Sequence, residues 1–70
     1  MGYLIEPFTK VLVRSTEKSK WKANFFDYYK QDDTFPYVTI NKAHWRFCIP
    51  YEGNERLHGT TEPPIKTFSL

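Results

Sequence analysis

The sequence has a single cysteine, Cys48, so this 70-residue chain cannot close a disulfide within itself. Small secreted domains commonly depend on such bridges, and the lone cysteine therefore predicts a reducing, cytoplasmic environment. No run of about 18 apolar residues is present, so we expect no transmembrane helix and no membrane partner. Residues 1–8 include Glu6 and Pro7 and no long apolar segment, and we expect no signal peptide.

Motifs of metal, nucleotide and catalytic sites are also missing. The soft metal ligands are His44, Cys48 and His58, of which the first two lie about 13 Å apart if their segment is an extended strand. Structural zinc sites normally use four ligands and paired spacings such as C-x-x-C, which do not occur here. Residues 53–59 lack the Lys-Ser/Thr pair of a phosphate-binding loop. We therefore expect no metal, no cofactor and no enzymatic activity.

Aromatic residues are abundant, with 6 Phe, 5 Tyr and 2 Trp making up 19% of the chain. Each buried ring removes roughly 150–250 Å² from water, which gives a chain of this length a dense core. Charged residues of both signs make up 26% of the sequence, and the net charge is only +2. The composition predicts one folded domain over residues 1–70 with a slight attraction to nucleic acid.

Apolar and polar residues alternate in four segments, a pattern typical of half-buried strands. The segments are residues 8–14, 21–29, 37–40 and 43–49. The last has the clearest alternation, which predicts that Trp45, Phe47 and Ile49 share one face. By the same pattern His44, Arg46 and Cys48 share the other face, and Pro50 ends the strand.

The C-terminal part reads as an ordered loop with Gly53 and Gly59 at positive φ. We expect one helical turn at residues 55–57 before a last short strand, and an edge strand or a frayed end at residues 65–70. Together the segments predict an all-β, SH3-like antiparallel barrel of about five strands with a single short helical turn near the C-terminus. We expect the protein to be a monomer or a weak homodimer that pairs through an edge strand.

Three segments carry a resemblance to a known group of proteins. They are PFxKVLVR at residues 7–14, WxAxFFxxY at 21–29 and CIPYEGNExLxGTT at 48–61. Over nearly the whole chain, these segments resemble a group of short uncharacterised proteins of gut bacteria and their phages. The resemblance implies a small stand-alone protein and supplies no activity.

The first two predicted strands also resemble Tudor-type modules, in which a Val-rich strand is followed by a strand with Trp and Ala. Here the spacing from Trp21 to Ala23 is one residue shorter and Phe25 takes the place of a Val. The resemblance implies an aromatic cage that holds a methylated lysine by cation–π attraction. Its candidate rings are Trp21, Phe26, Tyr28 and Tyr51, and packing in the core is the alternative role for each.

The sequence therefore predicts a non-enzymatic binding module, with two candidate classes of partner. The leading hypothesis is a protein or peptide bound through exposed aromatics of the second strand and of the C-terminal loop at residues 51–61. Its expected contacts are Trp21, Tyr28, Arg46 and Tyr51. The alternative is nucleic acid bound by the basic first hairpin, which would otherwise be only a solvated turn. Its expected contacts are Arg14, Lys18, Lys20, Lys22 and Arg46.

Overall fold

The computed structural model describes residues 6–64 and confirms the all-β prediction. The strands are β1 (Lys10–Arg14), β2 (Lys22–Tyr29), β3 (Tyr37–Thr39), β4 (His44–Trp45) and β5 (Phe47–Pro50), and they form one antiparallel sheet. A single 3-10 turn, η1 (Glu55–Leu57), follows where a helical turn was expected. The predicted edge strand at residues 65–70 lies outside the described residues. No helix in the described part of the chain is long and apolar enough to cross a membrane.

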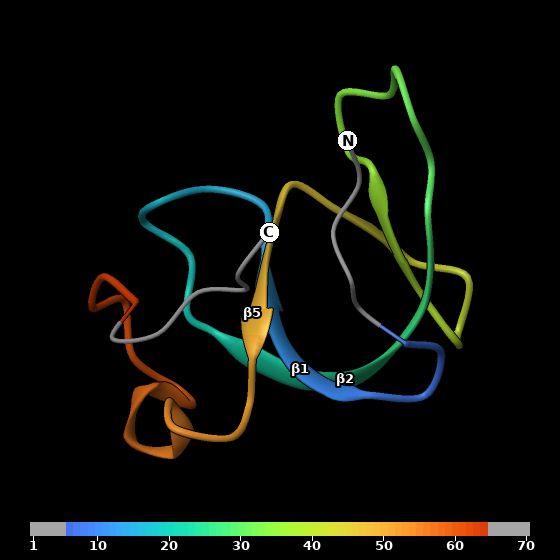
Figure 1. Ribbon diagram of the computed structural model, residues 1–70. Helices are drawn as coiled ribbons and strands as arrows, with labels where there is room; N and C mark the ends of the chain where they lie inside the picture. The colour runs from blue at the N-terminus through green and yellow to red at the C-terminus, as the bar shows by residue number, and fades with distance from the viewer. Residues whose placement is uncertain (1–5, 65–70) are drawn as a thin grey trace.

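The order of strands in the sheet is β4-β3-β2-β1-β5, which places two consecutive strands at opposite edges. Only Arg46 separates β4 from β5. The chain therefore changes from pairing with β3 to pairing with β1 within one residue. This is possible because the sheet is strongly curved. Figure 1 shows the strong curvature of β1 and β2 and the position of β5 on the other side of β1. The segment 43–49, predicted as one strand, is divided in this way into two.

The division at Arg46 also changes which residues share a face. Trp45 packs on the same cluster as Cys48, whereas Phe47 packs with Ile49 on the opposite side of the sheet. The predicted common face of Trp45, Phe47 and Ile49 is therefore wrong for Trp45. Strict alternation requires a straight strand, and the irregular residue between β4 and β5 breaks it.

Two hydrophobic clusters lie on opposite faces of β1. The β3-side cluster consists of Val11, Val13, Phe26 and Cys48, with Tyr37 and Trp45 packed against it. The tail-side cluster is named after residues 51–64, which we call the tail. It consists of Leu12, Trp21, Ile49 and Leu57, with Ala23, Phe47 and Tyr51 packed against it. Residues 11–13 of β1 are fully buried as a result, because the strand is covered on both faces and has no side that faces water.

The tail covers one face of the sheet because it is hydrogen-bonded to Trp21. The Trp21 amide donates to the carbonyl of Thr60 at 2.9 Å, and the Gly59 amide donates to the carbonyl of Trp21 at 2.9 Å. The indole N–H of Trp21 donates to the carbonyl of Glu62 at 2.8 Å. Within residues 6–64 the last strand predicted after the helical turn is reduced to an isolated parallel bridge between Trp21 and His58. Gly53 and Gly59 adopt the expected positive φ, at 90° and 83°.

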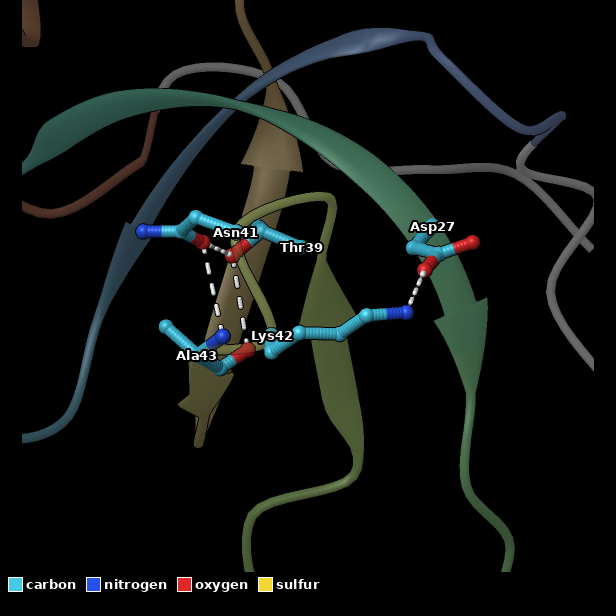
Figure 2. Close-up of polar contacts among 5 residues, drawn as sticks. All are labelled: Asp27, Thr39, Asn41, Lys42 and Ala43. Atoms are coloured by element: carbon cyan, nitrogen blue, oxygen red, sulfur yellow. Dashed lines mark hydrogen bonds and ion pairs between the residues drawn. The ribbon is translucent and has the colours of Figure 1, made fainter.

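The turn between β3 and β4 is held by side chains, as Figure 2 shows. The Asn41 Oδ1 atom accepts hydrogen bonds from the Thr39 hydroxyl at 2.6 Å and from the Ala43 amide at 3.4 Å. Lys42 adopts a positive φ of 69° in this turn, and its Nζ lies 3.8 Å from a carboxylate oxygen of Asp27. The turn therefore fixes the end of β3 beside β2 without a glycine.

Candidate binding surfaces

Trp21 was expected to face a partner, and the structure corrects this expectation. Its side chain is only 2% exposed and belongs to the tail-side cluster. The tail covers the ring and accepts the hydrogen bond of its indole N–H. A residue that is covered by its own chain on this scale is a core residue of the fold.

Arg14, expected to contact nucleic acid, is likewise buried, with 5% of its surface exposed. Its guanidinium lies over the Trp21 ring, 4.1 Å from the ring centroid. Its Nη1 atom donates to the carbonyls of Glu17 at 3.2 Å, Ser19 at 3.4 Å and Thr61 at 3.0 Å. Arg14 thus joins the first hairpin turn to the tail, and it does not present its charge to solvent.

The four candidate rings of a methyl-lysine cage do not come together. Phe26 is 3% exposed and packs in the β3-side cluster, on the opposite face of the sheet from Trp21. Tyr51 is half-buried against the tail-side cluster, and Lys10 Nζ lies 4.1 Å from its ring centroid. Of the four, Tyr28 is the ring that is well exposed, at 46%. The structure therefore does not form the cage.

Arg46 is exposed and lines a surface hollow of about 420 Å³ together with four other residues. We call this hollow the basic hollow, and its described lining is Thr16, Glu17, Lys18, Arg46 and Phe47. The pairing of Arg14 with Phe47 between β1 and β5 brings the two lining segments together. The turn that follows Arg14 must then lie beside Arg46, the residue that precedes Phe47.

Positive charge prevails around the basic hollow. Neither Lys18 nor Arg46 forms an ion pair within residues 6–64, where the salt bridges join Lys30 to Asp33 and Lys42 to Asp27. Glu17 is the one carboxylate in the described lining. Lys20 and Lys22, from the same hairpin, are also exposed. The structure therefore keeps four of the five residues predicted for nucleic-acid binding at the surface and brings two of them, Lys18 and Arg46, into one hollow.

A second surface carries exposed apolar side chains. A bulge in β2 between Phe26 and Tyr28 places Tyr28 opposite Val38, and the Ile40 amide donates to the carbonyl of Phe25 at 3.0 Å. Positions 38 and 40 lie two residues apart and so share one face of an extended chain. Residues that lie opposite each other in paired strands share a face of the sheet, so Tyr28 lies on the face of Val38 and Phe25 lies on the face of Ile40. Phe25, Tyr28 and Ile40 are therefore on one face, although Phe25 and Tyr28 are three residues apart. Their exposed fractions are 42%, 46% and 44%.

Phe8 is a further exposed apolar residue, and its backbone lies beside this region at the N-terminal side of β1. Its amide donates to the carbonyl of Phe26 at 2.7 Å, next to Phe25 in β2, and its side chain is 72% exposed. We call Phe8, Phe25, Tyr28 and Ile40 the apolar surface. Of these four residues, only Tyr28 was predicted from the sequence to contact a partner.

Phe8 also has an unusual backbone conformation, with φ at 69°. It lies in a turn in which the Thr9 amide and hydroxyl both donate to the carbonyl of Glu6, at 3.2 Å and 2.7 Å. Positive φ is uncommon for residues other than glycine and unfavourable for a bulky side chain. A large ring is thus held in solvent at a position where glycine would be the easier choice.

Titratable groups give little support for catalysis in the described residues. Burial raises the pKa of the Cys48 thiol to about 12, which keeps it protonated and unreactive at neutral pH. The Phe35 amide donates to Asp33 Oδ1 at 2.9 Å and lowers the pKa of that carboxyl. Among residues 6–64 no three His, Cys, Asp or Glu side chains are grouped so as to hold a metal ion.

Comparisons with protein families, with curated proteins and with solved structures find no match to this chain. The resemblance to short proteins of gut bacteria and their phages accordingly stays a prediction. The two surfaces described above are thus the basis for an argument about function.

Proposed function

We propose that this protein is a non-enzymatic binding module that docks a segment of a partner protein on the apolar surface. The observation that carries the proposal is the gathering of Phe25, Tyr28 and Ile40 on one face of the sheet, each more than 40% exposed. The largest apolar patch on a typical monomeric protein covers about 300–600 Å² and often serves an interaction. This retains the predicted class of partner and moves the contacts away from Trp21, Arg46 and Tyr51.

The size of the apolar surface favours a short segment over a second copy of the chain. Exposed fractions of 72%, 42% and 46% for Phe8, Phe25 and Tyr28 correspond to about 300 Å² of ring surface when a ring covers roughly 200 Å². A standard stable interface buries about 800 Å² on each partner. The apolar surface falls well short of that, so its occupant is a peptide segment that contributes a few apolar side chains.

Pairing of edge strands offers little additional area for a homodimer. Pro50, the last residue of β5, has no N–H to donate, and the Asn54 side chain donates to its carbonyl at 2.8 Å. At the other edge, β4 is only two residues long. Short edges interrupted by proline are a common way in which proteins avoid intermolecular strand pairing.

The backbone strain at Phe8 is a second argument for the same surface. A non-glycine residue at positive φ costs about 1 kcal/mol or more, and such strain is concentrated at functional sites. In the core, packing would offset this cost, but the Phe8 ring is 72% exposed. Burial of the ring against a partner would supply the missing compensation.

The double substitution Phe25→Thr and Ile40→Thr tests the proposal, because threonine is compatible with strand geometry and removes most of the apolar area. Tagged wild-type and variant proteins would be crosslinked in their native cells, and the captured proteins compared by quantitative mass spectrometry. We expect one or a few partners to be lost from the variant. The matched control is Phe35→Ser, which removes an exposed ring from the β2–β3 loop, outside this surface. Equal capture by the double variant and the control would contradict the proposal.

The SH3-like description and the cytoplasmic location belong to the same proposal. The order of strands, with one chain segment pairing first with β3 and then with β1, supports closure into a small barrel of SH3-like type. A buried thiol that has no cysteine partner in the chain supports a reducing compartment.

A further inference from the structure

We infer that the basic hollow is a binding site for single-stranded nucleic acid, in which Lys18 and Arg46 contact phosphates and Phe47 contacts a base. This site is separate from the apolar surface and does not depend on the proposed protein partner. The shape, the charge and the aromatic ring of the hollow together fit such a ligand.

Shape is the first part of the argument. Residues 16–18 and 46–47 come from distant parts of the sequence, and the β1–β5 pairing brings them around one hollow of about 420 Å³. The strands behind the hollow are well packed, since the neighbouring residues Val13 and Arg14 are buried. The site therefore combines the long side chain of Lys18 with a framework of buried strand residues.

Charge is the second part. Lys18 and Arg46 carry positive charges that form no ion pair within residues 6–64, and Lys20 and Lys22 continue the positive charge along the hairpin. Phosphates are the ligands that such exposed Lys and Arg side chains commonly bind, through charge-assisted hydrogen bonds. Glu17 is the single carboxylate in the described lining and leaves an excess of positive charge.

The ring is the third part, and it separates nucleic acid from a simple anion. Phe47 is half-buried and lines the hollow, and the Arg46 guanidinium lies 5.8 Å from its ring centroid. Bases of single-stranded nucleic acid stack on such rings and on guanidinium planes, while the phosphates follow the cations. A hollow that offers two cations next to one fixed ring matches this combination.

Binding would be measured by fluorescence anisotropy with a labelled mixed-sequence 12-nucleotide DNA at 50 and 200 mM salt. Each phosphate contact on a single strand contributes about −0.7 to the slope of log affinity against log salt. Two to four contacts therefore predict a fall in affinity of roughly 7-fold to 50-fold between these salt concentrations. Arg46→Gln and Lys18→Gln should each lower the slope by about 0.7.

The matched control is Lys30→Gln, which removes the same charge from a residue paired with Asp33 outside the hollow. It should leave the slope unchanged. An abasic oligonucleotide of the same length tests the ring, because it keeps the phosphates and removes the base. We expect it to bind at least about 5-fold more weakly than the normal oligonucleotide, the smallest effect usual for loss of one stacked base.

Three outcomes would overturn the inference. The first is no binding at 50 mM salt. The second is an equal effect of Arg46→Gln and Lys30→Gln, which would indicate attraction by net charge alone. The third is binding of a poly-glutamate peptide as tightly as the oligonucleotide, which would make the hollow a site for acidic protein segments instead.

Discussion

Substitution of Arg14 tests most directly whether this buried cation stabilises the fold. In the structure it donates to carbonyls of the first hairpin turn and of the tail, and it stacks on Trp21. Hydrogen bonds from a charged donor contribute roughly 1.5–3 kcal/mol each. The Nε atom of Arg14 is buried and has no hydrogen-bond partner among residues 6–64, and its desolvation offsets about 1–3 kcal/mol of the gain.

From these terms we expect Arg14→Met to lower the free energy of unfolding by about 2–3 kcal/mol, because Met keeps apolar contact with Trp21 but removes the charged hydrogen bonds and the cation–π contact. Arg14→Lys should lower it by more, about 3–4 kcal/mol, since a compact ammonium neither stacks on the indole as a guanidinium does nor reaches all three carbonyls, and it remains a poorly solvated charge. For a domain of this size, 1 kcal/mol corresponds to a change in melting temperature of about 4–8 °C.

Urea unfolding followed by circular dichroism at 25 °C would give both values, and the tail offers an independent readout. Hydrogen exchange of the Trp21 and Gly59 amides, which bond the tail to β2, should accelerate in both variants. The reasoning would be refuted if Arg14→Lys were as stable as the wild type, because charge without guanidinium geometry would then suffice. It would also be refuted if Arg14→Met were more stable than the wild type.

Two further substitutions probe the core. Thr39→Val keeps the shape of a fully buried side chain but removes the oxygen that accepts the Trp45 indole N–H at 3.0 Å. We expect this substitution to lower the free energy of unfolding by about 1–3 kcal/mol, measured by thermal unfolding. An unchanged melting temperature would contradict this expectation. The raised pKa of Cys48, about 12 against an ordinary value of 9.0, means that the unfolded chain loses the thiol proton first as pH rises. Stability should therefore fall above about pH 9, by roughly 1.4 kcal/mol between pH 8 and pH 10. Cys48→Ala should remove this part of the pH dependence in urea unfolding, and an identical dependence in that variant would rule out the thiol as its cause.

The strands were predictable from sequence because their residues follow a period of two on at least one face. The predicted segment 8–14 contains β1, and the helical turn at residues 55–57 lies where the sequence indicated. The bend at Arg46 was not predictable. Arg46 is as compatible with a straight strand as its neighbours are, and only the requirement that the chain pair with β3 and then with β1 imposes the break.

The candidate sites were harder to predict, since exposure depends on what the tail covers. A Trp at the start of a strand and an Arg at the end of another are ordinary surface candidates, and charged residues are rarely buried. Here the tail brings the carbonyls of Thr61 and Glu62 to these two side chains and satisfies their donors. Contacts over more than 40 positions in sequence leave no local signal in either strand.

Each of the two proposed surfaces arises where the sheet departs from regular pairing. Arg46 belongs to neither β4 nor β5, so its side chain stays exposed at the point where the sheet closes, next to the turn that follows Arg14. The apolar surface depends instead on the bulge in β2, which aligns Phe25 with Tyr28 although they are three residues apart. Because the irregularities lie in different strands, substitutions at Arg46 should not change partner capture, and those at Phe25 and Ile40 should not change the salt dependence of oligonucleotide binding. A variant that impaired both would indicate one continuous binding face.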